Sequence, residues 1–598
     1  MCGIVGIIKK KNLVSNEEIK SMLNKSIHRG PDAQGIYIDN NVGLGHNRLS
    51  ILDLSSDGKQ PMIWNNKYII TYNGEIYNYI ELRKELKKYG YKFKTKTDTE
   101  VILAAYDKWG INCVNRFNGM WAFAIYDKEK NIIFCSRDRF GIKPFYYKYD
   151  KTQFIFASEI KQLIDDEPEV NMKILTTFLV TSYLDYNDET FFKNIYRLAP
   201  SENLIFNINN FSLKRYKYYN LYDRVIEKNY KEKDAIEYFE ELFFSSIKLR
   251  LRSDVKVATS LSGGLDSSAI VAFASQEYRK QSGNIFSAIH AKSIDKKTDE
   301  SYYAKLVQKD TNINLTYITP TKEDFINNID DVIYTQEEPF GGPSVFMQYF
   351  VMREAKKNKN TVMLDGQGAD EVLLGYMKHY PAYLDPKNPL LFIRDYLSIV
   401  KNSKLTLNKL FQYYIFHTMP SIKNTYMKII SKNIKQNYMC LVDFDISKQN
   451  ADSYKSIKDL QIFELMNNMQ KMLRYEDKNS MRHSIETRLP FLDYRVVEFL
   501  LSIDKYLKIK NGWTKYILRK ILDKKISKEV VWRKNKFGYE SPMNKWLEDK
   551  NFFYKQIKKS KILNEIYATI PTNLKYYDLW KLYNIAKWEE IYNVKVGK

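Results

Sequence analysis

The 598-residue sequence has few of the residues that build disulfide, zinc or membrane-spanning structures. It holds four cysteines, Cys2, Cys113, Cys135 and Cys440, and no Cys-x-x-Cys pair. This spacing argues against a zinc ribbon or a disulfide framework and is typical of a reduced, intracellular protein. The sequence also lacks a secretory signal pattern at its start and any run of about 18 uninterrupted apolar residues. We therefore expect a cytoplasmic protein with no membrane partner.

Acidic residues are the minority charge, with 71 Asp and Glu against 94 Lys and Arg, which gives a formal net charge of +23. A polyanionic partner would suit this balance. However, the lysines are spread along the whole chain and form no block of five or six consecutive basic residues. We interpret the charge as solvated surface and expect no nucleic-acid binding.

The pattern of short apolar runs changes along the chain and divides it into two parts. Residues 1–208 contain brief runs such as GIVGIIK and MWAFAIYD with a few helical segments between them, which predicts an α+β domain of mainly antiparallel sheet. From about residue 230, long helical segments alternate with apolar strands such as TVMLDG, which is typical of a parallel α/β sheet. We place the second domain at residues 209–598.

The segment KVATSLSGGLDSSAIVAFAS predicts a phosphate-binding turn between a strand and a helix. Gly263 and Gly264 allow the backbone to approach an anion, Ser267 and Ser268 offer hydroxyl donors, and the helix N-terminus adds partial positive charge. The chain has neither a Walker A loop nor a G-x-G-x-x-G fingerprint. The alternative is a plain strand-to-helix turn capped by Asp266, and the loop alone does not decide between the two.

A second acidic cluster follows another apolar strand, in TVMLDGQGADEVLLGY. Asp370 and Glu371 would lie, like Asp266, beyond the carboxyl end of a parallel strand, where α/β sheets bind ligands. We expect Asp266 and Asp370 to share a Mg²⁺ ion, because this ion prefers a couple of carboxylates together with phosphate oxygens. The alternative is an acidic pair that complements a helix dipole.

The start of the chain, MCGIVGI, places a cysteine where removal of Met1 would make it N-terminal. Cys2 would then carry a thiol and a free α-amine, whose reference pKa of about 8 lies well below the roughly 10.4 of lysine. One residue could thus supply both the nucleophile and its base. The alternative is a small residue that begins a first strand.

Ten motifs resemble known families. MCGIVGI, HRGPD, HNRLSIL, NGEIYN and TDTE together resemble the class II glutamine amidotransferase domain, an N-terminal-nucleophile fold. SLSGGLDSS, DGQGADE, SIETRLPFLD, KYILRK and WRKNKFG resemble the synthetase domain of glutamine-hydrolysing asparagine synthetase, including its ATP pyrophosphatase-type loop. The resemblance covers most of the chain in the family's order. It implies stacked antiparallel sheets with helices, followed by an α/β domain with a parallel sheet.

In the first domain, the resemblance implies that Cys2 is the glutaminase nucleophile. Arg48 would hold the α-carboxylate of glutamine, and Asp98 with Glu75 would hold its α-amine. The Asn73 side chain and the Gly74 N–H would form the oxyanion hole. Taken alone, Arg48 could equally form a surface ion pair, Asp98 a helix cap and Asn73-Gly74 a hairpin turn. The expected glutamine-binding residues are Arg48, Leu49, Ser50, Ile51, Leu52, Asn73, Gly74, Glu75 and Asp98.

In the second domain, the resemblance implies ATP as a co-substrate. Lys515 would neutralise charge on the phosphates, although a solvated helix lysine is the alternative for this residue taken alone. Glu371 would act near the acyl-adenylate as the base that deprotonates ammonia, whose attack on β-aspartyl-AMP gives asparagine and AMP. The expected ATP contacts are Leu261, Ser262, Gly263, Gly264, Asp266, Ser267, Ser268, Ile289, Asp365 and Gly366.

The sequence departs from the family pattern at two places. The stretch QEEPFGGPSVF, Gln336 to Phe346, lacks the arginine that could hold an acceptor α-carboxylate, while Asp365 replaces a small residue and Gln367 an acidic one. The acceptor could therefore be aspartate or another carboxylate, for instance a sugar acid in surface-polysaccharide assembly. The second departure is a long helical, aromatic-rich insertion at about residues 377–470.

The leading hypothesis from the sequence is ATP-dependent synthesis of asparagine with ammonia from glutamine. The expected partners are small-molecule substrates, with a homodimer as one candidate assembly. The insertion could cap the active site or make a subunit contact. A non-catalytic module that retains the fold is disfavoured, because Cys2, Asp98, Asp266 and Glu371 are all present.

Overall fold

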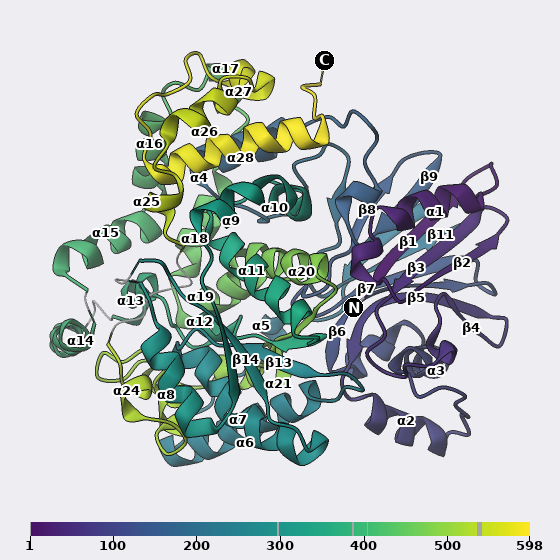
Figure 1. Cartoon of the computed structure of the whole chain (residues 1–598), viewed down its shortest axis with the longest axis horizontal. Coiled ribbons are helices and arrows are strands. Elements are labelled where there is room, and N and C mark those ends of the chain that lie inside the picture. Colours follow the sequence, from purple (N-terminus) through teal and green to yellow (C-terminus); the bar gives the residue numbers. More distant parts are fainter. Residues whose placement is uncertain (1, 296–297, 385–387, 404, 535–540, 598) are drawn as a thin grey trace.

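The computed structural model describes residues 2–295, 298–384, 388–403, 405–534 and 541–597, and it contains two parts of different architecture. Antiparallel sheets occupy one end of the molecule, and a helix-rich part built on a parallel sheet occupies the other (Figure 1). The sequence expectation of an α+β part followed by an α/β part is confirmed.

The N-terminal part stacks two six-stranded antiparallel sheets. Ile4, Ile8 and Leu44 of the first sheet pack against Ile69 and Ala124 of the second in one buried apolar layer. The first sheet has the order β10 (Tyr196–Arg197), β8 (Tyr146–Tyr149), β9 (Gln153–Ala157), β1 (Gly3–Lys9), β3 (Val42–Arg48) and β2 (Ala33–Asp39). The second has the order β12 (Ser212–Lys217), β11 (Glu202–Asn207), β7 (Ile132–Arg137), β6 (Gly119–Asp127), β5 (Tyr68–Ile76) and β4 (Met62–Trp64).

Helices cover the outer faces of these sheets. Helix α1 (Asn16–Asn24) begins with a capping box formed by Ser15 and Glu18 and packs against β1 and β3. Helices α2 (Tyr79–Lys88) and α3 (Asp98–Trp109) cover the second sheet. The longer apolar runs predict β1, β3, β5 and β6 correctly, whereas short strands such as β4 and β10 carry no such run, because they are held by pairing with their neighbours rather than by their own pattern.

The C-terminal part is built on a five-stranded parallel sheet. Its order is β15 (Asn314–Ile318), β14 (Ser287–Ala291), β13 (Val257–Ser260), β16 (Val362–Leu364) and β17 (Glu486–Arg488). The helices associated with this sheet include α6 (Glu232–Arg250), α7 (Leu265–Ser282), α8 (Ser301–Thr311), α10 (Ile329–Gln336), α11 (Ser344–Lys357), α12 (Ala369–Val372), α20 (Gln470–Arg482), α21 (Tyr494–Ser502) and α23 (Tyr516–Leu522). The chain ends in α26 (Lys550–Ile557), α27 (Lys561–Ile566) and α28 (Tyr576–Tyr592).

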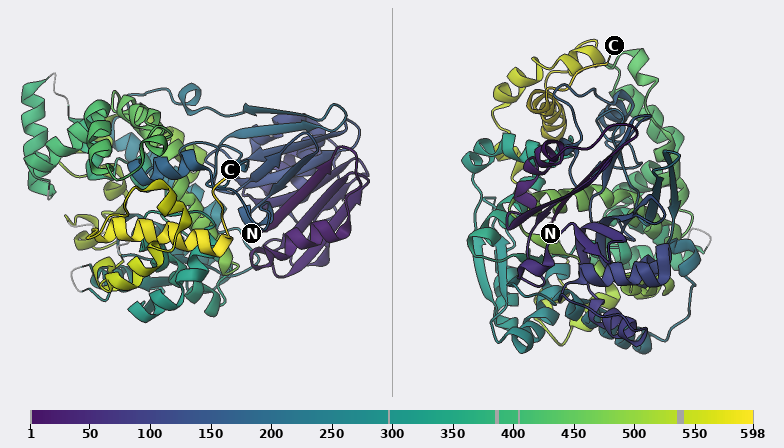
Figure 2. Two further views of the ribbon diagram at one scale, coloured as in Figure 1. Left: turned by 90° about the horizontal axis from the view of Figure 1, so that it is seen from above. Right: turned by 90° about the vertical axis from the view of Figure 1, so that its right-hand side faces the viewer.

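The described residues of the segment 377–470 are mostly helical, as expected, and most of them lie at the end of the molecule away from the antiparallel sheets (Figure 2). Their inner sides share an apolar cluster that includes Tyr383, Ile399, Leu410 and Leu460. The α-helices here are α13 (Tyr380–Tyr383), α14 (Pro389–Asn402), α15 (Leu407–Thr418), α16 (Pro420–Ile430), α17 (Gln436–Met439), α18 (Asp445–Ser453) and α19 (Ile457–Phe463). In the part of the chain that the structure describes, no helix is both long enough and apolar enough to cross a bilayer.

The two parts meet at the fully buried guanidinium of Arg29. Its Nε donates to the carbonyl oxygen of Cys2 at 3.0 Å, and its Nη1 reaches Glu159 at 3.0 Å. Two further bonds, at 2.8 and 3.1 Å, join it to the carboxylate of Asp477 on α20 of the other part. Burial alone would lower the pKa of Arg29, but Asp477 and Glu159 outweigh burial and raise it. Arg29 therefore connects the first strand to the parallel-sheet part.

Replacing Arg29 with methionine should destabilise the protein strongly. The change leaves the buried Asp477 without this partner, which typically costs about 3–5 kcal/mol. Arg482→Met is the matched control, because the Arg482–Asp331 pair is about one-third exposed and should contribute at most about 1 kcal/mol. Urea unfolding followed by tryptophan fluorescence measures both, and equal losses in the two variants would contradict this role of Arg29.

Candidate functional site

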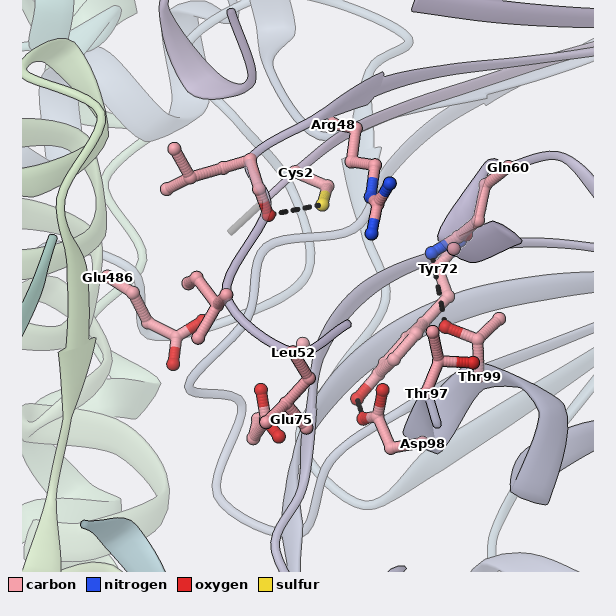
Figure 3. A pocket seen from close by; sticks show the side chains of 14 residues that line it. Cys2, Arg48, Leu52, Gln60, Tyr72, Glu75, Thr97, Asp98, Thr99 and Glu486 are labelled. Atoms are coloured by element: carbon pink, nitrogen blue, oxygen red, sulfur yellow. Dashed lines mark hydrogen bonds between the residues drawn. The ribbon is translucent and has the colours of Figure 1, made fainter. Parts of the chain in front are cut away.

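A pocket lies beside Cys2, the residue immediately before β1. It collects side chains from β3, β5, the start of α3 and the distant strand β17 (Figure 3). Of the residues predicted to bind glutamine, the pocket lining includes Arg48, Leu49, Ile51, Leu52, Gly74, Glu75 and Asp98.

Cys2 and Asn73 lie in direct contact. The Cys2 backbone N–H donates to Asn73 Oδ1 at 3.0 Å, which orients the amide of Asn73. The other end of that amide, Nδ2, is buried and has no hydrogen-bond partner among the described residues. A buried donor of this kind costs free energy unless a ligand completes it. Burial also raises the pKa of the Cys2 thiol, so the thiol needs a base to become a nucleophile.

Gly74 follows Asn73 where β5 runs close to β6. A Cβ at this position would lie 2.2 Å from the carbonyl oxygen of Met120, so only glycine fits. The backbone beside Asn73 can therefore line the pocket directly. The two predicted oxyanion-hole residues thus lie together, next to Cys2.

Arg48 ends β3 and extends along the pocket wall (Figure 3). Its guanidinium donates to the carbonyl oxygens of Ser55, at 2.6 Å, and of Asp53. Gly58 makes room for it, because a Cβ there would lie 2.1 Å from Arg48 Nη2. The loop carbonyls hold the cation without neutralising its charge, so it remains suited to a carboxylate ligand.

The facing wall of the pocket carries carboxylates. Asp98 accepts hydrogen bonds from Tyr72 Oη at 2.8 Å and from the Ile76 N–H at 2.9 Å, yet burial raises its pKa to about 6. Burial and the proximity of Asp98 raise the pKa of Glu75 well above its usual range. Burial is the main cause of both shifts, and the neighbouring carboxylates add to it, so an additional positive charge would stabilise the ionised forms. The wall is suited to an ammonium group.

Glu486 is a third acid that lines this pocket, and it was not among the residues predicted from the sequence. It lies on β17 of the parallel sheet, in the motif SIETRLPFLD, to which no pocket role was assigned. Arg488, two residues later, donates to Glu486 and reaches Glu75 at 3.4 Å. The second part of the chain therefore completes the pocket of the first, and only the motif's resemblance could have drawn attention to this residue.

The predicted phosphate-binding turn joins β13 to α7. Gly263 has φ +79°, a left-handed conformation that favours glycine, and the Gly264 N–H donates to Ser262 Oγ at 3.1 Å. Ser267 Oγ lies 3.2 Å from the Ser262 N–H and accepts from it. Ser268 Oγ is buried without a hydrogen-bond partner among the described residues. The turn thus presents hydroxyl groups at the start of an 18-residue helix.

Lys515 joins the two acidic clusters that follow β13 and β16. Its Nζ donates to the Asp266 carboxylate at 2.6 and 2.7 Å and lies 2.6 Å from Asp370 Oδ1. Gly375 allows this approach, since a Cβ there would lie 1.9 Å from Asp370 Oδ1 and 2.3 Å from Lys515 Cε. Lys515 is therefore buried in a charged cluster and is not the solvated helix lysine that the sequence alone allowed.

Glu371 lies next to this cluster and is buried. Tyr376 Oη donates to it at 2.8 Å, but burial, with the charge of Asp370, raises its pKa to about 7. Asp365 accepts a 2.7 Å bond from Ser260 Oγ, and a Cβ on Gly366 would lie 3.1 Å from Asp266 Cβ. Leu261, whose N–H bonds to the Ile289 carbonyl, continues β13 into the turn. These predicted residues surround one edge of the parallel sheet.

The predicted metal ligands, Asp266 and Asp370, lie within reach of a single ammonium group. Across the described ranges, no group of three His, Cys, Asp or Glu side chains is arranged to hold a metal ion. Two carboxylates without a third protein ligand fit Mg²⁺, which takes its remaining ligands from water and substrate phosphates.

Comparisons with known families match both parts of the chain. A glutamine amidotransferase domain model matches residues 1–218, and an asparagine synthase model matches residues 238–570. Asparagine synthetase [glutamine-hydrolyzing] 1 of Bacillus subtilis is 33% identical over 92% of this chain and 88% of its own length. The chain belongs to the glutamine-hydrolysing asparagine synthetase family.

Other members of the family are also similar. A Methanocaldococcus jannaschii protein, provisionally named asparagine synthetase [glutamine-hydrolyzing] 2, is 41% identical over 64% of this chain and 77% of its own length. Asparagine synthetase [glutamine-hydrolyzing] 2 of Bacillus subtilis is 32% identical over 89% of this chain and 71% of its own length. Membership makes the chain a ligase that carries a glutamine amidotransferase domain.

In the last resemblance motif, WRKNKFG, the residues from Asn535 onward lie outside the part of the chain that the structure describes.

Removing the Tyr72 hydroxyl should shift the pH dependence of glutamine use. The carboxylate of Asp98 must be ionised to bind an ammonium group, so kcat/KM for glutamine should fall as the pH drops through about 6. The Tyr72 hydroxyl stabilises that ionised form. Tyr72→Phe should therefore raise the pKa of Asp98 and move the acid limb upward by about one pH unit.

Glutaminase assays across pH 5–9 (about two units either side of neutral) measure this limb. Tyr68→Phe, on the same strand but away from the pocket lining, is the control and should leave the limb in place. An unchanged limb in Tyr72→Phe would separate Asp98 from glutamine binding.

Proposed function

We propose that this enzyme makes asparagine from aspartate, using ATP and ammonia released from glutamine, through β-aspartyl-AMP with release of pyrophosphate. Two chemically different sites support the proposal, one beside Cys2 and one around Lys515. The observation that carries it is the contact between Cys2 and Asn73, which leaves a buried amide donor beside a cysteine.

In the first site, Cys2 would attack the side-chain amide of glutamine once Met1, which lies outside the described residues, has been removed. The freed α-amine would take the thiol proton and return it to the leaving ammonia. Asn73 Nδ2 and the Gly74 N–H would stabilise the oxyanion of the tetrahedral intermediate. Water would then release glutamate from the thioester, and Arg48 with Asp98 and Glu75 would orient the substrate.

In the second site, the serines of the turn would hold the ATP phosphates while the acceptor carboxylate attacks the α-phosphorus. Pyrophosphate leaves as the acyl-adenylate forms, and Lys515 lies where it can bind the separating charge. Asp266 and Asp370 are the residues that would hold Mg²⁺, which when bound would neutralise phosphate charge. Glu371, with a pKa of about 7, can accept the proton that ammonia loses on attack.

Apolar packing connects the two sites. Leu49 and Ile51 of the glutamine pocket belong to the same buried cluster as Leu261 and Leu364 of the parallel-sheet part. We expect free ammonia to cross between the sites within this shared interior, because a charged ammonium ion would pay a large desolvation cost there.

The acceptor itself could be a different carboxylate, such as a sugar acid. The stretch Gln336 to Phe346 offers no arginine, and its acids are already engaged: Glu338 pairs with Arg197 at 2.8 Å, and Glu337 accepts from the Ile160 N–H at 2.9 Å. Pyrophosphate release with a panel of aspartate and sugar acids decides this point. Release with sugar acids but not aspartate would replace the leading proposal.

Changes at Cys2 should abolish glutamine hydrolysis and spare the second site. Cys2→Ala should make no glutamate from glutamine but should still form the amide from added ammonium, because the second site does not use the thiol. Cys2→Ser should be nearly as impaired, since a hydroxyl is a far poorer nucleophile near neutral pH. A peptide tag left before Met1 should mimic Cys2→Ala without changing a side chain.

Mass spectrometry of the N-terminus is the companion measurement. Fully active protein that retains Met1, or glutamine hydrolysis by Cys2→Ala, would contradict the assignment. Cys113→Ala serves as the control, because this buried thiol lies outside the pocket and its loss should leave hydrolysis intact.

Asp266→Asn should abolish acceptor-dependent pyrophosphate release and leave glutamine hydrolysis detectable. The change removes a carboxylate charge from the cluster around Lys515, far along the chain from the Cys2 pocket. Separate assays of pyrophosphate and glutamate measure the two reactions. ADP and phosphate as products of the wild-type enzyme, instead of AMP and pyrophosphate, would overturn the adenylate mechanism.

A further inference from the structure

Three consecutive helices of the insertion, α14, α15 and α16, present large apolar side chains to solvent. Leu390 is 82% exposed, Phe411 63% and Ile429 63%. On each helix the exposed apolar residues are three or four positions apart, or adjacent, so they form one stripe per helix. The stripes are Leu390, Ile393, Leu397 and Val400 on α14, Leu407, Phe411 and Tyr414 on α15, and Ile422, Tyr426, Ile429 and Ile430 on α16.

These outward stripes are not required to hold the helices in place, because the opposite sides are already packed. Ile399 of α14 and Leu410 of α15 are buried in the apolar cluster of the insertion. On α16, Lys423 is buried and its Nζ donates to Tyr183 Oη of the N-terminal part at 3.0 Å. The outer faces therefore remain as apolar surface beyond what folding uses, which marks an interaction site.

The charge of this segment selects among the partners that could cover it. Residues 388–435 contain eight Lys or Arg and a single acidic residue, Asp395. Asp395 is buried and bound by Arg394 at 2.7 Å, whereas Lys401, Lys409, Lys428 and Lys432 are exposed. The surface thus combines apolar stripes with exposed positive charge.

We propose that α14, α15 and α16, here called the insertion face, dock on the surface of a membrane that contains anionic lipids. Amphipathic helices with aliphatic and aromatic residues on one side and lysines nearby lie in the bilayer interface in this way. Anionic head groups attract the lysines, while the apolar side chains enter the boundary of the acyl chains. A second copy of the chain is disfavoured, because two such faces would bring like charges together. A nucleic acid is also disfavoured, because it has no apolar interior in which the aliphatic side chains could be buried.

The position of the insertion face allows this docking. The three helices lie along one edge of the molecule, away from the antiparallel sheets (Figures 1 and 2). The protein would rest on the lipid surface without spanning it, which agrees with the lack of a bilayer-crossing helix among the described residues. This docking differs from the sequence expectation of no membrane partner, and it is independent of the proposed reaction.

Vesicle flotation of the full chain tests the proposal. The protein should float with vesicles of equal parts phosphatidylcholine and phosphatidylglycerol, and much less with pure phosphatidylcholine. Binding should weaken as salt is raised, because the lysine contribution is screened. Failure to float with the anionic vesicles at low salt would overturn the proposal.

Two sets of variants locate the binding surface. Phe411→Ser with Ile429→Ser should lower partitioning about ten-fold per residue, because each loses apolar burial. Lys401→Gln, Lys409→Gln and Lys428→Gln should each lower it about five-fold. The matched controls are Leu13→Ser with Ile226→Ser, exposed apolar residues elsewhere, and Lys84→Gln, Lys87→Gln and Lys88→Gln on α2. All variants should retain wild-type glutamine hydrolysis, which verifies folding.

Three results would contradict the membrane assignment. The first is equal flotation of the insertion-face variants and their controls. The second is a dimer in light scattering that the apolar substitutions convert to a monomer, which would make the face a contact between copies. The third is binding to DNA that the lysine substitutions weaken while the apolar substitutions leave it unchanged.

Discussion

The arrangement of both halves depends on the buried guanidinium of Arg29. It binds the carbonyl oxygen of Cys2 on one side and the carboxylate of Asp477 on the other. A buried cation must be satisfied on every side, so its partners can occupy only a narrow range of positions. The same group therefore fixes the position of the N-terminal cysteine relative to the helix α20, which follows the insertion. Correct folding of each half thus depends on its contact with the other half.

The pocket beside Cys2 follows from this alignment, because its walls come from both halves. Glu486 and Arg488 on β17 face Glu75 and Asp98 from the antiparallel part. Burial is the main cause that raises the pKa of Glu75 and Asp98, and the neighbouring carboxylates add to it. An α-ammonium group would stabilise their ionised forms, while Arg48 lies across the pocket for an α-carboxylate. The pocket is thus complementary in charge to an amino-acid zwitterion, and the Asn73 amide beside Cys2 has a donor without a partner among the described residues.

Around Lys515, two carboxylates surround a lysine side chain of the protein itself. One buried ammonium holds Asp266 and Asp370 together, and Ser268 contributes an unpartnered hydroxyl among the described residues. Phosphate oxygens entering this site would compete with the carboxylates for Lys515, which frees the carboxylates for a divalent cation. In the proposed reaction, the ligand groups of the turn and of the acidic cluster would bind a charged, phosphate-bearing substrate.

The sequence by itself determined the two architectures, the N-terminal cysteine, the Gly-Gly turn and the acidic pair after β16. Each of these features depends on local periodicity or on a few consecutive residues, so it can be recognised without knowledge of the fold. Tertiary structure alone decided the third pocket acid, the bridge made by Lys515 and the outward stripes of the insertion. Glu486 lines the Cys2 pocket although it is more than 400 residues from Cys2 in the sequence, and Lys515 contacts Asp266, which is 249 residues earlier in the sequence. Periodicity identifies an apolar helix face, but whether that face is covered depends on which distant elements pack against it.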